Sequence, residues 1–207
     1  MVRNGVALEQ YTPVPVEDAK RALHLDPGWP VAGIVGRLAP EKGQALAVEG
    51  WPRVLAKQPE ARLLLVGDGE DALTLSDQAE ALGLGDRVIF AGFQADPLPY
   101  FAACDVVLMP SRREGLGLAA IEAMALERPV LAANVGGLPE AVGDGETGLL
   151  LPGDAAIFAD AFLTLYADPA RRAAMGRAGR ARVAAHFNAE TQFARLREVL
   201  ADAANAA

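Results

Sequence analysis

Residues 110–129 read PSRREGLGLAAIEAMALERP, and this stretch decides the fold. It follows a strand-like apolar run at Asp105–Met109 and leads into a helical pattern over Leu118–Leu126, in which Glu122 is the only polar side chain. Apolar runs that alternate with helices predict a parallel α/β sheet. Since an ionised carboxylate is costly to bury alone, Glu122 must either face outward or meet hydrogen-bond donors.

A second carboxylate, Glu114, precedes Glu122 in the glycine-bearing loop. The two glycines of Gly115–Leu118 let a ligand approach backbone N–H groups at a helix N-terminus, a position that binds anions. Carboxylates on both sides of these amides suit a ligand with hydroxyls at both ends and phosphate in the middle, such as a sugar nucleotide. Spacing alone leaves an alternative open, in which Glu114 is a solvated loop residue and Glu122 an exposed helix residue.

Composition excludes several function classes. The chain has 207 residues, 52% hydrophobic and 22% charged, which fits one large globular domain. Its net charge of −8 argues against a general nucleic-acid or membrane-surface role, because such roles need a basic face. A phosphate-bearing ligand would therefore need cations placed locally around it.

Few residues are available for metal binding or disulfides. One cysteine, Cys104, and two histidines, His24 and His186, predict neither an internal disulfide nor a zinc site. Cys104 is better explained as a small buried residue than as a reactive thiol. No apolar run approaches the roughly 20 residues that span a bilayer, and the N-terminus lacks the apolar core of a signal peptide. These features predict a cytoplasmic protein.

The pattern along the chain predicts a doubly wound parallel sheet of about six strands with additional C-terminal helices. The expected strands are Val31–Val35, Ala61–Val66, Arg87–Ala91, Asp105–Met109, Pro129–Ala133 and Gly148–Leu151. The expected helices are Val16–Leu23, Gln44–Lys57, Asp71–Leu82, Leu98–Ala102, Leu118–Leu126, Leu138–Val142, Ala155–Ala167, Pro169–Ala185 and Ala189–Ala203. Residues 1–30 are expected to form an interdomain segment, 31–187 the Rossmann-like domain and 188–207 a crossover helix.

Ligands of such sheets bind at the carboxyl ends of the strands, which directs attention to the loops there. The loop after the first strand, Gly36–Gly43, carries Arg37 and Lys42. Arg37 could bind a phosphate through two parallel hydrogen bonds, and Lys42 could add a point charge. The alternative is a surface arginine and lysine, one of them paired with Glu41.

Three further loops also contain glycine. Residues 67–72, GDGEDA, match the dinucleotide fingerprint, but three acidic side chains would face the pyrophosphate and the loop does not follow the first strand. We therefore reject the fingerprint, although Gly67 could still lie close to a ligand. Gly92–Gln94 could offer backbone groups and Phe93 to a base, with core packing as the alternative for Phe93. Gly136–Gly137 could bind sugar or phosphate or could be a structural turn.

Together, these motifs resemble the C-terminal, donor-binding domain of the retaining GT-B glycosyltransferases of family 4. The matching pieces are RNGVALEQYTP, GIVGRLAPEKG, LLLVGDG, VIFAGF, CDVVLMPSRREGLGLAAIEAMA, PVLAANVGGLPEAVGDGETGLLLPGD and the HFN segment. They cover nearly the whole chain in the order of the family. The pair of glutamates separated by seven residues is specific, whereas the glycine-rich loops alone would not be.

The resemblance implies roles for these residues. Arg37 and Lys42 would hold the donor diphosphate, Glu114 the hydroxyls of the donor sugar, and Glu122 the ribose. The backbone of Gly92–Gln94 would meet the base. The implied catalytic residues are Glu114, Arg37 and Lys42, and the implied donor site comprises Gly36, Arg37, Lys42, Gly67, Gly92, Phe93, Gln94, Glu114, Gly115, Leu116, Gly117, Leu118 and Glu122. The donor would be a UDP-, GDP- or ADP-sugar carrying a hexose, with no metal and no cofactor.

The chain departs from the family in sequence and in length. Leu116 stands where phenylalanine is usual, and Glu127-Arg128 replace a usual glycine, which leaves the preferred donor sugar open. Full enzymes of this kind have an N-terminal domain that binds the acceptor, and we expect this domain to be missing here. The last helix would cross onto that domain, so its apolar face is expected to favour self-association.

Two other functions remain open. The first is a stand-alone nucleotide- or sugar-binding module without catalysis. The second is a flavodoxin-like or phosphorylatable regulatory domain, for which only Asp68, Glu70 and Asp71 offer the acidic cluster and no lysine and threonine accompany it.

Overall fold

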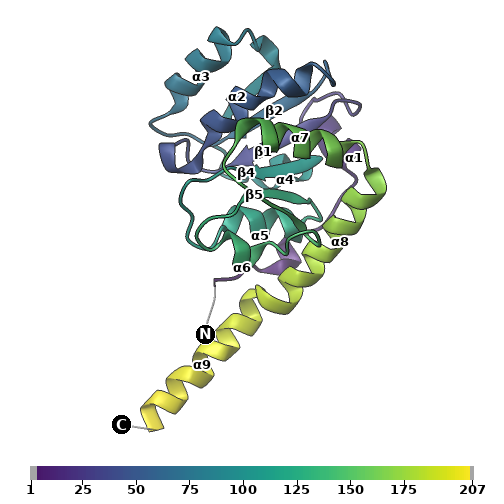
Figure 1. Ribbon diagram of the computed structural model, residues 1–207. Coiled ribbons are helices and arrows are strands. Elements are labelled where there is room, and N and C mark those ends of the chain that lie inside the picture. The colour runs from purple at the N-terminus through teal and green to yellow at the C-terminus, as the bar shows by residue number, and fades with distance from the viewer. Residues whose placement is uncertain (1–3, 206–207) are drawn as a thin grey trace.

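A computed structural model describes residues 4–205 of the chain (Figure 1). Its centre is a six-stranded, all-parallel sheet with the strand order β3-β2-β1-β4-β5-β6. The strands are β1 (Val31–Val35), β2 (Arg62–Val66), β3 (Val88–Gly92), β4 (Val106–Met109), β5 (Val130–Ala133) and β6 (Gly148–Leu151). The predicted doubly wound α/β fold is confirmed.

Helices cover both faces of the sheet. They are α1 (Val16–Ala22), α2 (Gln44–Leu55), α3 (Ala72–Ala81), α4 (Leu98–Ala102), α5 (Leu118–Ala125), α6 (Leu138–Ala141), α7 (Ala155–Tyr166), α8 (Pro169–His186) and α9 (Ala189–Asn205). Short 3-10 turns lie at Leu8–Gln10, Pro40–Lys42 and Gly85–Arg87. One apolar core lies beneath α1, α4, α5 and α8, and a second lies beneath α2, α3 and α7.

The central strands are buried on both faces, which explains their continuous apolar sequences. Every residue of β2, β4 and β5 is buried. Buried parallel strands lose the alternation of polar and apolar residues that a half-exposed strand would show. The predicted strands and helices are all present, and their ends differ from the prediction by at most two residues.

The strand order reverses between β1 and β4, which are neighbours in the sheet. The loops that follow these two strands therefore leave the same edge side by side. The backbone N–H of Arg112 donates to the carbonyl of Glu41 over 2.8 Å, which joins the two loops directly. Gly43 has φ of +71°, and a Cβ there would lie 2.0 Å from the carbonyl oxygen of Pro110. Only glycine permits this approach.

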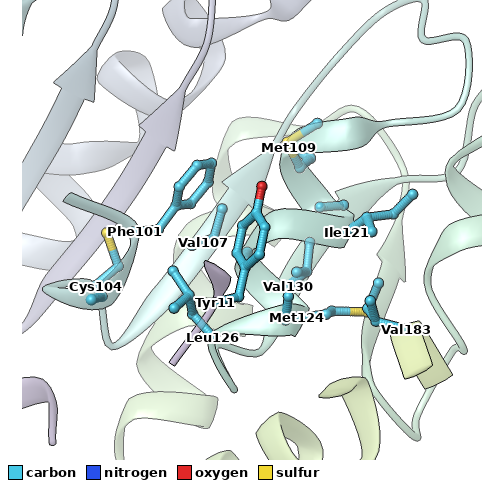
Figure 2. Packing of buried hydrophobic residues seen from close by; sticks show 14 of the residues in the cluster. Tyr11, Phe101, Cys104, Val107, Met109, Ile121, Met124, Leu126, Val130 and Val183 are labelled. Atoms are coloured by element: carbon cyan, nitrogen blue, oxygen red, sulfur yellow. The ribbon is translucent and has the colours of Figure 1, made fainter. Parts of the chain in front are cut away.

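The N-terminal segment is tied to the body of the molecule by specific contacts. Val6 forms a parallel bridge with Asn188, at the junction of α8 and α9. Tyr11 packs in the core beside Val107 and Leu126 (Figure 2). The division of the chain at residues 30 and 187 stays a prediction.

Helix α9 extends away from the sheet (Figure 1). Its exposed apolar residues are Phe193, Leu196, Val199 and Leu200, with exposed fractions between 38% and 60%. This face is where self-association was expected, and that expectation stays a prediction. Across residues 4–205, none of the helices combines the length and apolar character that a membrane crossing requires.

Candidate functional site

A cleft of about 390 Å³ opens at the carboxyl ends of β1 and β4, where the strand order reverses. This is the position at which open α/β sheets bind ligands. Its lining consists of Asn4, Ile34, Val35, Gly36, Arg37, Lys42, Gln44, Met109, Pro110, Ser111, Glu114, Leu116, Gly117, Leu118 and Ala119. The β1–α2 loop and the β4–α5 loop supply most of these residues, and both were predicted to form the site.

Lys42 and Glu114 form an ion pair in the cleft. The distance between Lys42 Nζ and Glu114 Oε2 is 2.7 Å, and the hydroxyl of Ser111 donates to the same oxygen over 3.3 Å. The Glu114 side chain is only 11% exposed, so the alternative of a solvated loop residue is wrong. The pair places a cation and a carboxylate beside each other, as recognition of a phosphate and a neighbouring hydroxyl would require.

Arg37 lies at the outer rim of the cleft. Its guanidinium pairs with Glu41 in the next turn, and its side chain is 61% exposed. The surface pairing that was the alternative for Arg37 is therefore present, and the same residue also lines the cleft. Behind it, the amide of the buried Gln44 donates from Nε2 to the carbonyl of Arg37 over 2.8 Å. Gln44 fixes the loop backbone, a role that sequence reasoning missed.

The N-terminus of α5 also faces the cleft. Gly117 precedes the helix with φ of +78°, and no side chain caps the helix there. The first amides of a helix have no partner within the helix and carry partial positive charge. Since Leu118 and Ala119 line the cleft, an anion bound there would lie close to the N-terminus of this helix.

Glu122 lies outside the cleft lining, one turn further along α5 than Leu118. Its carboxylate is half-buried, and the hydroxyl of Tyr11 donates to Oε1 over 3.0 Å. Burial raises the pKa of Glu122, and the Tyr11 hydrogen bond opposes that rise. Glu122 therefore meets a hydrogen-bond donor rather than solvent alone. Sequence reasoning missed Tyr11 because no local pattern links residues 111 positions apart.

Two of the glycine-rich loops are explained by packing. A Cβ on Gly67 would lie 2.0 Å from the carbonyl oxygen of Gly36, and a Cβ on Gly137 would lie 1.8 Å from that of Gly115. The backbone N–H of Gly137 also donates to the carbonyl of Glu114 over 3.2 Å. These glycines let neighbouring backbone pack closely against the two loops that line the cleft. A contact between Gly67 and a ligand stays a prediction.

The proposed base-binding residues lie at the end of β3, outside the cleft lining. Phe93 is 77% exposed, so core packing does not explain it. The amide of Gln94 donates to the carbonyl of Ala91 over 2.7 Å, and the carbonyl of Gly92 accepts from the N–H of Gly67 over 2.8 Å. A contact of these residues with a base remains a prediction.

Cys104 is fully buried, as expected, and its thiol donates to the carbonyl of Tyr100 over 3.1 Å. Burial raises the pKa of the thiol to about 12, so a reactive thiolate does not form near neutral pH. Among residues 4–205, no three histidine, cysteine, aspartate or glutamate side chains are grouped to hold a metal ion. The expectation of a metal-independent site stays a prediction.

Comparison with known proteins gives one family match and several close relatives. A sequence model of the family described as "Glycosyl transferases group 1" matches residues 16–182. A GDP-mannose-dependent monoacylated alpha-(1-6)-phosphatidylinositol monomannoside mannosyltransferase of Corynebacterium glutamicum is 36% identical over 208 residues. The match covers 95% of this chain and 54% of the relative, so the chain spans about half the length of that relative.

Two solved structures resemble the fold over most of the chain. Anabaena Alr3699/HepE in complex with UDP is 30% identical, with a TM-score of 0.89 over 97% of this chain and 57% of that one. The C-terminal domain of LpcC, a glycosyl transferase group 1 family protein of Francisella tularensis, is 28% identical, with a TM-score of 0.78. That match covers 88% of this chain and 98% of the LpcC domain.

Proposed function

Because the chain belongs to the glycosyl transferases group 1 family, we propose that it binds a nucleoside diphosphate sugar in the β1/β4 cleft. In this proposal it is the donor domain of a retaining glycosyltransferase that transfers a hexose to an acceptor. The similarity to a structure that contains UDP supports a nucleotide ligand. The Corynebacterium relative is named as GDP-mannose-dependent, so UDP and GDP are both candidates.

The observation that carries the proposal is the Lys42–Glu114 pair beside the N-terminus of α5. Lys42 and the helix amides provide positive charge for a diphosphate in a protein of net charge −8. Glu114 provides a hydroxyl acceptor within 2.7 Å of that cation. A diphosphate bonded to a sugar presents charged oxygens and hydroxyls next to each other.

The same arrangement supports a reaction in which the diphosphate leaves. The bond between the anomeric carbon and the phosphate oxygen breaks, and a bond to the acceptor oxygen forms on the same face of the sugar. The acceptor proton passes to the leaving phosphate. Lys42, Arg37 and the α5 amides would stabilise the charge that develops on the diphosphate, while Glu114 holds the sugar. This route needs no enzymic nucleophile.

Acceptor binding is proposed to lie in a further domain. The Corynebacterium relative is about twice the length of this chain, and the LpcC match is itself named a C-terminal domain. Orientation of two reactants accounts for about 7–11 kcal/mol of barrier lowering. The chain alone is therefore expected to bind the donor without transferring it efficiently. A binding module without catalysis is the second candidate, because the cleft residues would serve it equally well.

Calorimetric titration of the chain with UDP-, GDP- and ADP-sugars tests the proposal. We expect saturable binding of at least one of them. Absence of a binding signal with all three, on a sample shown by circular dichroism to be folded, would contradict it. Titration with free monosaccharides serves as the control and should give weaker binding, because the diphosphate contacts are missing.

A further inference from the structure

Two buried polar side chains line the β1/β4 cleft, those of Gln44 and Ser111. The hydroxyl of Ser111 donates to Glu114, so its hydrogen is in use. Gln44 is only 1% exposed, and its Nε2 donates to the carbonyl of Arg37 over 2.8 Å. Its Oε1, however, has no hydrogen-bond partner among residues 4–205. A buried acceptor without a donor is unfavourable, and such groups are rare in folded proteins.

The orientation of the Gln44 amide is fixed by its neighbour. If the nitrogen and oxygen of this amide exchanged places, Oε1 would face the carbonyl oxygen of Arg37, and two acceptors would oppose each other. Oε1 is therefore the atom that lacks a partner. Gln44 is also the first residue of α2, directly after Gly43, which packs against the backbone of Pro110. The backbone of Gln44 is thus held where the two loops of the cleft meet.

A comparison with Trp51 shows why the position of Gln44 matters. The Nε1 atom of Trp51 is also buried without a partner among the residues that the structure describes. Trp51 belongs to the apolar core beneath α2, α3 and α7 and does not line the cleft. Gln44 does line the cleft. A ligand in the cleft is therefore well placed to supply the hydrogen that Oε1 lacks.

Resting on the proposed function, we propose that Gln44 is a further binding residue for the donor and that its Oε1 accepts a hydrogen bond from a hydroxyl of the hexose. The diphosphate offers acceptor oxygens, so it cannot be the partner. Glu114, which is proposed to hold the hexose, lines the same cleft as Gln44. The terminal torsion of a glutamine has a broad energy minimum, so a small rotation of the amide turns Oε1 toward a ligand on the lining.

This contact makes Gln44 a residue that determines specificity. A site that pairs a buried polar group with a substrate hydroxyl discriminates against an analogue without that hydroxyl, because the polar group is then left unpaired. The bare nucleoside diphosphate has no hexose and leaves Oε1 without a partner. The affinity gained by adding the hexose should therefore depend on an acceptor at position 44.

Two substitutions separate the acceptor from the contact with the loop. Gln44→Met and Gln44→Glu both remove Nε2 and its hydrogen bond to the carbonyl of Arg37, but only Gln44→Glu keeps an oxygen acceptor. The matched control is Gln78→Met. Gln78 also donates from Nε2 to a backbone carbonyl, that of Ala45 over 3.0 Å, and lies outside the cleft lining.

Calorimetric titration with UDP-glucose and UDP, and with GDP-mannose and GDP, gives the ratio of the affinities for the sugar nucleotide and for the bare diphosphate. We expect Gln44→Met to lower this ratio by about three- to tenfold, which corresponds to one hydrogen bond, and Gln78→Met to leave it unchanged. Gln44→Glu should not lower the ratio, because its negative charge opposes the bare diphosphate at least as strongly as the sugar nucleotide. Thermal unfolding verifies that each variant is folded.

An unchanged ratio in Gln44→Met, or ratios that fall equally in Gln44→Met and Gln44→Glu, would overturn the inference while nucleotide binding stands. Gln44→Leu takes the place of Gln44→Met if the latter does not fold, and a lowered ratio in Gln44→Glu overturns the inference in either case. A folded wild-type chain that binds none of the four ligands would instead contradict the proposed function itself.

Discussion

At the scale of single residues, the two carboxylates of the site are distinguished by their partners. Glu114 faces the ammonium group of Lys42 at 2.7 Å, whereas Glu122 faces the neutral hydroxyl of Tyr11 at 3.0 Å. The ammonium group is a charged hydrogen-bond donor, and the hydroxyl is a neutral one. The two glutamates are therefore suited to different parts of one ligand.

Substitution by glutamine separates the two proposed roles. If Glu114 contacts the sugar, Glu114→Gln should weaken the sugar nucleotide by about 1–2 kcal/mol and leave the bare nucleoside diphosphate nearly unchanged. If Glu122 contacts the ribose, Glu122→Gln should weaken both ligands. Calorimetry with each ligand pair provides the measurement. Equal effects of Glu114→Gln on both ligands would contradict its assignment to the sugar.

The pH dependence of stability gives a second test at Glu122. Burial raises its pKa in the folded state, so the protonated form is favoured there. Stability should fall as pH rises from the unfolded pKa, about 4.3, through the raised folded pKa, and the loss persists at neutral pH. Glu122→Gln removes this loss of folding stability, because glutamine does not ionise.

The melting temperature of Glu122→Gln should therefore exceed that of the wild type at neutral pH. The difference should disappear below the unfolded pKa, where both side chains are neutral. Differential scanning calorimetry across this range provides the measurement. An advantage that is the same at acid and neutral pH would show that ionisation of Glu122 is not its cause.

At the scale of elements, local pattern was sufficient to predict the strands and helices. Fully buried strands such as β4 and β5 have continuous apolar sequences, and helix α5 begins directly after a glycine with a sequence in which Glu122 is the only polar residue. The strand order and the pairing of the β1–α2 loop with the β4–α5 loop depend on contacts between distant residues. The rule that parallel sheets bind ligands at the carboxyl ends of their strands pointed to both loops in advance, and the family resemblance agreed with it.

Some contacts could not be predicted because they contradict local expectation. Lys20 lies on the short helix α1, where a lysine is expected to face solvent, yet it is 2% exposed. Its ammonium group contacts Asp105 Oδ2 at 2.8 Å and the carbonyl of Trp29 at 2.6 Å. Two contacts at the site could not be predicted for the same reason. The residues next to Tyr11 and Gln44 in the sequence do not indicate that Tyr11 donates to Glu122 or that Gln44 donates to the carbonyl of Arg37.

Packing behind the β4–α5 loop can be tested at Gly137. Its Cβ position is 1.8 Å from the carbonyl oxygen of Gly115, so Gly137→Ala must displace the loop that carries Glu114. We expect a loss of about 1–3 kcal/mol in unfolding free energy, together with weaker nucleotide binding. The control is Gly153→Ala, because no atom lies within 4 Å of its Cβ position. Denaturant unfolding that gives equal stability for both variants would contradict the close approach.

At the scale of the whole molecule, the distribution of charged groups agrees with the proposed donor-binding role. The chain carries a net charge of −8, and its cleft contains two cations, Arg37 and Lys42, each paired with a glutamate, beside the N-terminus of α5. Helix α9 extends away from the sheet (Figure 1), and its apolar residues Phe193, Leu196, Val199 and Leu200 are exposed. The match covers only 54% of the Corynebacterium relative.

We expect the chain alone to bind its donor but to transfer sugar at no meaningful rate. In the proposed function, the donor contacts lie within this chain and a further domain orients the acceptor. A coupled assay of nucleoside diphosphate release, with and without candidate acceptors, should detect at most slow donor hydrolysis. Robust transfer to a defined acceptor by residues 1–207 alone would contradict the division of roles, and activity gained by joining the remainder of a full-length relative would support it.

The most direct test of the central claim is calorimetric titration of Lys42→Ala beside Lys57→Ala. Both variants remove one positive charge, but Lys42 lines the cleft and Lys57 is exposed after the end of α2, outside it. We predict that Lys42→Ala weakens the nucleoside diphosphate by about 1.5–3 kcal/mol, as loss of a charge-assisted contact requires, while Lys57→Ala binds like the wild type. Equal affinities of the two variants would show that the diphosphate does not bind at the β1/β4 cleft.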